Sequence, residues 1–278
     1  MTQMPTYAFP PGGMPDHSAD PVGTAVFTPA YAVLPADTQR EIVTSFLPGW
    51  TGHKLWILAR PLTGFAETFA QYAVHLSPGG GSATPEPDPS AQAAIFVAKG
   101  LLRLVIGAEV HLLRAGSFAF LPASKAWQIW NDSDEDAGFH WVRKRYVPGE
   151  GLAQPEPFVI HEDDITANKM PGAEDTWTTK RFFDPLDLRY DFHMTIVTFQ
   201  PGGRIPFAET HVMEHGLYVL QGTAKYLLNT DWVDVGPGDF MWLRAFCPQA
   251  CVATGTEPFR YLLYKDVNRH AALSLGAL

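Results

Sequence analysis

The sequence predicts an all-β protein made of two tandem β domains of one fold. Three observations lead to this prediction: many short apolar runs that end at turn-forming residues, few stretches with helical periodicity, and an internal repeat. Of the 278 residues, 46% are hydrophobic and 18% are charged, which is typical of a globular protein. This length accommodates two domains of roughly 120–140 residues, each with its own core.

The predicted strands are short runs rich in Val, Ile, Phe, Tyr and Trp, and each is followed by a turn former. In chain order they are 93–100, 101–107, 117–123, 193–199, 216–222, 239–245 and 259–267. The 24 glycines and 24 prolines supply many positions at which strands end in turns. Only short pieces such as 38–46 have a pattern compatible with a helix.

An internal repeat relates residues 77–131 to residues 200–254. Both segments open with Pro-Gly-Gly, continue through a strand that ends in glycine, and pass through a hairpin to a glycine followed by an aromatic strand. The two inner glycines are Gly100 and Gly116 in the first copy and Gly222 and Gly238 in the second, so both pairs are offset by 122 residues. A general similarity among β proteins does not predict two identical spacings, so we expect a duplicated fold.

The repeat divides the chain into an N-terminal domain, residues 1–150, and a C-terminal domain, residues 151–278. The second domain contains the stretch AETHVMEHGLYVLQG, residues 208–222, which is dense in potential metal ligands. With the offset of 122, Glu209, His211, His215 and Gln249 correspond to Pro87, Pro89, Ala93 and Trp127. None of these counterparts can bind a metal. The ligand cluster is therefore interpreted as functional rather than as a requirement of the fold.

The spacing of these side chains favours convergence inside a barrel. Alternate residues of a strand face one side, so Glu209 and His211 share a face. His215 keeps that parity if the strand pairing is unbroken, and Gln249 can approach from a neighbouring strand. Glu214 has the opposite parity and is interpreted as a surface group or a group behind the ligands. A lone buried histidine is usually a packed core residue, but two imidazoles, a carboxylate and an amide oxygen suit octahedral Mn²⁺ or Fe²⁺ better than structural Zn²⁺.

These residues resemble the two cupin motifs. The stretches PGG…ETHVMEHGLYVLQG and GPGDFMWLRAFCPQ fit that frame, with Glu209, His211 and His215 where cupins usually carry His, His and Glu, and with Gln249 in place of the later histidine. A doubled cupin is a bicupin, two tandem jelly-roll-like barrels. Together with AVLPADTQREIVTSFLPGW and FRYLLYKDVNRH, the ligand set resembles the (S)-ureidoglycine aminohydrolase family over about residues 30–270, most specifically over 200–270.

The resemblance implies an enzyme that uses one Mn²⁺ per chain, in the C-terminal domain, to convert (S)-ureidoglycine and water to (S)-ureidoglycolate and ammonia. The metal ligands it implies are Glu209, His211, His215 and Gln249. The substrate contacts it implies are Tyr226, Tyr261, Lys265, Glu209 and Gln249, with Lys265 and Tyr261 as the catalytic residues.

An exposed strand face is the ordinary place for a lysine such as Lys265. Inside a barrel beside a dication, however, its pKa would fall, and it could act as a base or proton shuttle. Trp242 and Arg244 could also reach the cavity, and parity alone does not decide whether they do. Two alternative functions stay open: an iron-dependent cupin dioxygenase, and a bicupin that binds a ligand without turning it over.

Charge and composition restrict the expected partners. The net charge of −9 argues against a nucleic acid or an anionic membrane, and no apolar run approaches the ~18 residues of a membrane span. The expected partners are the small ureido substrate and further copies of the chain in a homo-oligomer.

No secretory signal is recognised at the start, and Cys247 and Cys251 are interpreted as buried free thiols, so a cytoplasmic location is expected. Residues 1–30, rich in Pro and Gly, could be disordered or could pack between domains or subunits.

Overall fold

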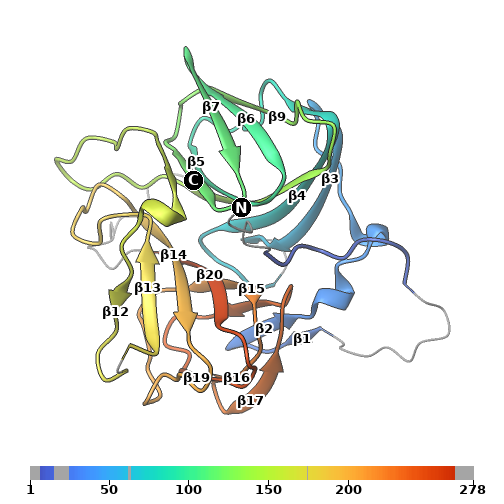
Figure 1. Cartoon of the computed structure of the whole chain (residues 1–278). Coiled ribbons are helices and arrows are strands. Elements are labelled where there is room, and N and C mark those ends of the chain that lie inside the picture. The colour runs from blue at the N-terminus through green and yellow to red at the C-terminus, as the bar shows by residue number, and fades with distance from the viewer. Residues whose placement is uncertain (1–6, 16–24, 62–63, 174, 267–278) are drawn as a thin grey trace.

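A computed structural model describes residues 7–15, 25–61, 64–173 and 175–266. Its regular structure is almost entirely β, as predicted, and forms two β units packed against each other (Figure 1). The helical pieces are single 3-10 turns: η1 (Ala36–Thr38), η2 (Glu41–Val43) and η4 (Glu162–Asp164). No helix in these ranges is long and apolar enough to cross a membrane.

The N-terminal unit is a nine-stranded sheet that curls on itself through the long strand β4 (Ala70–Ser82). β4 pairs with β10 (Ala137–Arg145) over one part of its length and with β9 (Trp127–Trp130) near its end, so it belongs to both faces. The other strands of this sheet are β3 (Trp50–Ala59), β5 (Ala91–Lys99), β6 (Leu101–Ile106), β7 (Glu109–Arg114), β8 (Ser117–Leu121) and β11 (Phe158–His161).

The C-terminal unit combines an eight-stranded sheet with a three-stranded sheet. The larger sheet consists of β1 (Val26–Phe27), β2 (Tyr31–Leu34), β12 (Asn168–Lys169), β13 (Trp177–Arg181), β14 (Phe192–Phe199), β15 (His215–Gln221), β18 (Phe240–Leu243) and β20 (Phe259–Asp266). The smaller sheet consists of β16 (Ala224–Leu228), β17 (Asp231–Val235) and β19 (Gln249–Ala253). Apolar side chains from both sheets meet in one buried cluster, which is the core of this barrel.

The strand registers of the two units are equivalent. In the N-terminal unit, Ala93 on β5 pairs with Arg143 on β10. In the C-terminal unit, His215 on β15 pairs with Lys265 on β20. Both partners are offset by 122 residues, as in the sequence repeat. The repeat is therefore a repeat of structure, and positions that it relates can be compared directly.

Each unit includes strands from the other half of the chain. β1 and β2 extend the C-terminal sheet, where β2 pairs with β18, and in Figure 1 these blue strands lie with the C-terminal unit. Conversely β11, which follows residue 150, pairs with β8 of the N-terminal unit. The hydrogen-bonded sheets thus cross residue 150 in both directions, and a domain boundary at this residue stays a prediction.

In addition to the apolar core of each barrel, a further apolar cluster fills the space between the two barrels. Phe118 of the N-terminal unit stacks on Phe182 with ring centroids 4.2 Å apart, and Phe69 stacks on Tyr264 at 3.9 Å. Tyr7, from the N-terminal arm, packs against the same cluster. Because buried apolar side chains of both units pack together in this cluster, each unit is expected to depend on the other for its structure.

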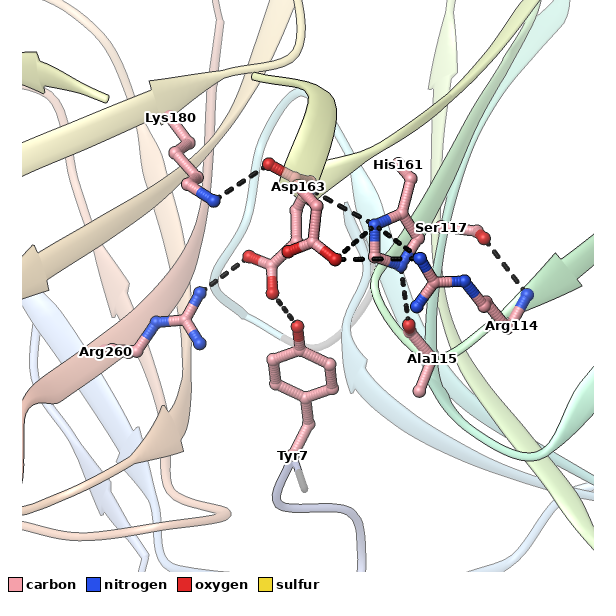
Figure 2. A network of polar contacts seen from close by, with 9 residues as sticks. Tyr7, Arg114, Ala115, Ser117, His161, Asp163, Lys180 and Arg260 are labelled. Carbon is pink, nitrogen blue, oxygen red and sulfur yellow. Dashed lines mark hydrogen bonds and ion pairs between the residues drawn. The ribbon is translucent and has the colours of Figure 1, made fainter. Parts of the chain in front are cut away.

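A buried polar network fixes the segment between the units (Figure 2). Glu162 is 2% exposed and accepts hydrogen bonds from the Tyr7 hydroxyl and, at 2.6 Å, from the Arg260 guanidinium. Lys180 Nζ donates to the Glu162 carbonyl oxygen at 2.8 Å. Burial, followed by the nearby Glu162 carboxylate, raises the pKa of Tyr7. The network thereby joins the N-terminal arm, the linking segment and β20.

Candidate active site

The C-terminal barrel contains a cavity of about 100 Å³ that brings the predicted site residues together. The predicted residues that line it are Glu209, His211, His215, Gln249, Tyr261 and Lys265. The other lining residues are Met170, Trp177, Thr179, Arg181, Thr195, Val197, Leu217 and Leu263. Tyr226 lies behind this lining, where it contacts Gln249.

Glu209 and Gln249 are held opposite each other by a two-way backbone bridge, in which each N–H donates to the other carbonyl oxygen at 2.9 Å. Glu209 and His211 lie in irregular chain, because β15 begins only at His215. Strand pairing is thus broken between Glu209 and His215, so the parity that an unbroken strand would give His215 does not apply. His211 is held instead through its carbonyl oxygen, which accepts a hydrogen bond from Phe246 N–H at 2.6 Å.

The donors fit a cation that prefers nitrogen and oxygen ligands. Glu209 Oε1 and His211 Nε2 are 3.3 Å apart, near the roughly 3 Å expected between adjacent ligands of an octahedral ion with bonds of about 2.1 Å. Burial lowers the pKa of His215 to about 3, so its imidazole is neutral, which is the form that binds metals. Within the described residues, no group of three His, Cys, Asp or Glu side chains forms a preassembled metal cluster. The metal therefore stays a proposal.

Lys265 lies inside the barrel rather than on an exposed strand face. In the sheet it is flanked by His193 on β14 and by His215 on β15, its register partners. Burial lowers the pKa of Lys265, and the positive charge of Arg181 lowers it further, whereas Glu209 opposes the shift. A lysine with this surrounding gives up its proton more readily than an exposed one.

The two tyrosines hold their protons. Burial raises the pKa values of Tyr226 and Tyr261 well above the usual value, so both are neutral hydroxyls. Their oxygens are 3.5 Å apart, and Tyr226 donates to Gln249 Oε1 at 2.9 Å. Tyr226 therefore orients the Gln249 amide, while Tyr261 lines the cavity itself.

Two residues beside the cavity were not predicted from the sequence. Arg181 ends β13 and lines the cavity with Trp177 and Thr179, which precede it at spacings of two. His193 lies on β14, where its Nε2 is buried without a hydrogen-bond partner among the described residues, and burial lowers its pKa to about 4. The signal for both was the period-two alternation in WTTKR and HMTIVTF.

A second and larger cavity, of about 560 Å³, adjoins the opposite side of the ligand segment. Trp242 and Arg244 line this cavity and not the one that holds the predicted ligands. Glu214 also lines it and is only 5% exposed, so of its two interpretations a surface group is wrong and a group behind the proposed ligands remains. The reverse face of the sheet is covered by the N-terminal unit rather than by solvent.

Cys247 and Cys251 are free and buried, as predicted.

The cupin domain family matches residues 72–143 and 195–264, with one match in each unit. The (S)-ureidoglycine aminohydrolase of Arabidopsis thaliana is 31% identical over 259 residues, which cover 92% of this chain and 83% of that protein. The chain belongs to the (S)-ureidoglycine aminohydrolase family of bicupins. The family and the two-barrel fold predicted from the sequence are thereby confirmed.

Two further relatives agree with this assignment. The (S)-ureidoglycine aminohydrolase of Escherichia coli K12 is 29% identical over 235 residues, covering 84% of this chain and 87% of that protein. The crystal structure of a Pseudomonas aeruginosa protein named for its induction by glyoxylate has a TM-score of 0.90 and 54% identity. It covers 98% of this chain and 99% of its own. The likeness therefore extends over both barrels.

Proposed function

We propose that the chain hydrolyses (S)-ureidoglycine to (S)-ureidoglycolate and ammonia. Its family membership supplies the reaction. The observation that carries the proposal for this chain is the convergence of Glu209, His211, His215, Gln249 and Lys265 on one cavity. In the N-terminal barrel, the counterparts of Glu209, His211, His215 and Gln249 have no side chain that can bind a metal. The fold alone therefore does not create this group of candidate ligands.

We further propose that Glu209, His211, His215 and Gln249 hold one Mn²⁺ per chain. When bound, the ion supplies Lewis acidity and positive charge that offsets the charge of the substrate. Two imidazoles with a carboxylate and an amide oxygen, and no thiolate, support Mn²⁺ over a structural Zn²⁺.

Arg181 is the residue we assign to the substrate carboxylate. (S)-Ureidoglycine carries an amine, a ureido nitrogen and a carboxylate on one carbon, so its binding site needs a partner for the negative charge. Arg181 lines the cavity, and its guanidinium makes no hydrogen bond or ion pair with another described residue. A guanidinium matches a carboxylate with two parallel N–H···O bonds.

Lys265 is the proton donor and acceptor that we assign to the reaction. Its ammonium gives a proton to the substrate amine, the carbon–nitrogen bond breaks, and ammonia leaves as the ureido nitrogen forms a C=N bond. Water then adds to that carbon, and neutral Lys265 takes the proton that the water releases. Because one residue serves both steps, water enters on the face that ammonia left, and the configuration is retained. The neutral Tyr261 hydroxyl provides a hydrogen bond that orients the substrate.

The test is ammonia release from freshly generated (S)-ureidoglycine by the purified chain. The expected result is a rate well above that in buffer, with (S)-ureidoglycolate as the product. A racemic product would contradict the single-face mechanism. Oxygen consumption with an aromatic or diketone substrate would favour a dioxygenase, and binding without ammonia release would favour a non-catalytic bicupin.

We also predict a homo-oligomer in the cytoplasm. The exposed apolar side chains of Val212 and Phe246 lie together at the second cavity and support an interface, because a gathered apolar patch is commonly covered by a partner. The two buried free thiols are compatible with a reducing compartment. Light scattering after size exclusion tests the assembly, and a strict monomer would contradict it.

A further inference from the structure

The N-terminal unit reaches the active site through Glu214, the residue before His215. The buried Glu214 carboxylate accepts hydrogen bonds from Glu67 N–H at 2.6 Å, Thr68 N–H at 2.9 Å and the Thr68 hydroxyl at 2.6 Å. A fourth bond comes from Trp242 Nε1 at 2.6 Å. Three of the four donors thus belong to the N-terminal unit. Hydrogen bonds to an ionised acceptor are short and strong, so this set fixes the side chain.

The same contacts extend to both neighbours of Lys265. Glu214 N–H donates to Asp266 Oδ1 at 2.7 Å. The Thr68 hydroxyl lies 3.1 Å from the hydroxyl of Tyr264. Tyr264 and Asp266 precede and follow Lys265 on β20. Movement of the 67–68 segment would therefore be passed to the strand that carries the catalytic lysine.

Gly216 shows how closely the N-terminal unit approaches the strand that begins at His215. A Cβ atom at Gly216 would lie 2.6 Å from Cζ of Phe69, so a side chain here would displace that ring. Phe69 also stacks on Tyr264. The repeat-related residue in the metal-free barrel is Ala94, which does carry a methyl group. The close approach is therefore specific to the barrel that contains the cavity.

The repeat provides an internal reference for Glu214. The equivalent residue is Gln92, which lies beside Ala93 and is also buried. Gln92 Nε2 donates to Asp191 Oδ1 across the interface. In the N-terminal barrel the neutral amide of Gln92 makes one described hydrogen bond to the other unit. At the equivalent position of the C-terminal barrel, the Glu214 carboxylate accepts three such hydrogen bonds.

We infer that Glu214 is a positioning residue through which the Glu67–Thr68 segment of the N-terminal unit sets the placement of His215 and Lys265. Its catalytic readout rests on the proposed function. The N-terminal barrel therefore contributes to turnover by supplying the hydrogen-bond donors that hold Glu214, and with it His215 and Lys265, in place.

Three variants of the full chain separate positioning from stability. Glu214→Gln keeps the shape of the side chain but places an amide NH₂, itself a donor, among four hydrogen-bond donors. Thr68→Val removes one donor on the N-terminal side without touching a proposed ligand. The matched control, Gln92→Met, removes the cross-barrel bond at the equivalent position of the metal-free barrel. For each variant the kcat, KM, Mn²⁺ dissociation constant and melting temperature are measured.

We expect Glu214→Gln to lower kcat and Mn²⁺ affinity by about 10–100-fold each, as for groups that orient metal ligands, while KM changes little. Thr68→Val should also lower kcat and Mn²⁺ affinity, by smaller factors, and its melting temperature should stay near that of the wild type. Gln92→Met should lower the melting temperature and leave kcat and Mn²⁺ affinity unchanged.

Wild-type kcat and Mn²⁺ affinity in both Glu214→Gln and Thr68→Val would overturn the inference. Equal losses in Gln92→Met would also overturn it, because they would show a general effect of stability. If Glu214→Gln does not fold, Thr68→Val decides. If the wild type releases no ammonia from (S)-ureidoglycine, the proposed function fails, whereas the Mn²⁺ dissociation constants still test the role of Glu214.

Discussion

The two barrels share one strand register, yet one is filled with aromatic rings and the other contains a polar cavity. In the N-terminal barrel, Trp127 occupies the place of Gln249 and packs edge-on against Trp141, with ring centroids 5.8 Å apart. Trp141 also contacts Trp50, at 5.6 Å. Large rings thus occupy the interior where the C-terminal barrel has the proposed ligand side chains and a cavity. The cavity is therefore a product of a few side chains and not of the fold.

The cation at the equivalent strand position differs in the same way. Arg143 takes the place of Lys265 and is ion-paired with Glu86, whose side chain is 6% exposed. Burial lowers the pKa of Arg143, but the hydrogen bonds that its guanidinium donates to the Glu86 carboxylate raise the pKa overall. The pKa of Lys265 is lowered by burial, and no carboxylate among the described residues is hydrogen-bonded to it to offset that effect. The same position thus holds a structural cation in one barrel and a readily deprotonated one in the other.

The largest expected effect is the loss of metal from one barrel only. His211→Ala and His215→Ala should each remove bound Mn²⁺ and with it nearly all ammonia release. Trp127→Ala should keep one Mn²⁺ per chain, although the cavity it leaves should cost about 3–5 kcal/mol of stability. Elemental analysis of the purified variants provides the measurement. Two metals per chain, or Mn²⁺ retained in both histidine variants, would contradict the asymmetry.

Removing the two equivalent cations should have opposite consequences. Lys265→Ala should lower turnover by about 10²–10⁴ with folding and Mn²⁺ content intact, because a general acid–base group is lost. Lys265→Arg should not restore it, since a guanidinium stays protonated. Arg143→Met should leave kcat unchanged but cost about 3–5 kcal/mol of stability, because Glu86 loses its partner. Near-normal turnover of Lys265→Ala would refute the role of the lysine.

Substrate binding should be weakened by loss of the cation at the cavity and not by loss of one outside it. Arg181→Gln should raise KM by roughly 10–100-fold with a small change in kcat, given about 1.5–3 kcal/mol for hydrogen bonds to a charged group. The control is Arg244→Gln, in the second cavity, which should leave KM unchanged. Steady-state kinetics of the two variants provide the KM values. Equal KM values would show that Arg181 does not bind the substrate carboxylate.

The smallest expected effect concerns acid stability at the barrel interface. His140 is fully buried without a hydrogen-bond partner among the described residues, and burial lowers its pKa from 6.5 to about 3. The unfolded chain therefore binds a proton below pH 6.5 that the folded chain refuses until about pH 3. Stability should be fully present above pH 6.5 and fall below it, by up to about 1.4 kcal/mol per pH unit for one such group.

His140→Leu copies the residue at the equivalent position of the C-terminal barrel, Leu262. Urea unfolding of the metal-free proteins at pH 7.5 and about pH 5 should show a shallower loss of stability in this variant. Other buried histidines titrate in both proteins, so the difference isolates His140. Parallel losses would show that its protonation is not linked to unfolding.

The sequence predicted the barrels and six of the residues that line the cavity, because both depend on local alternation and on the 122-residue repeat. The register partners Ala93–Arg143 and His215–Lys265 reproduce that offset. The strand exchange was not predictable in this way. Pairing of β2 with β18 and of β11 with β8 joins segments far apart in the chain, and nothing in their local pattern identifies the partner.

Residues behind or beside the ligands were harder to predict for a related reason. Alternation shows which side chains share a face, but it does not show what covers the opposite face. Glu214 was assigned correctly to the face away from the ligands, yet that face packs on the Glu67–Thr68 segment rather than on solvent. Arg181 reaches the cavity because β13 pairs with β14, and Arg181 precedes the segment 200–254 that the sequence repeat covers.

The most direct test of the account is to titrate Mn²⁺ into the chelated chain while ammonia release from fresh (S)-ureidoglycine is recorded. If the C-terminal barrel alone forms the site, activity should be absent without metal and should saturate at one Mn²⁺ per chain. Full activity in the metal-free chain, or saturation only at two Mn²⁺ per chain, would contradict it.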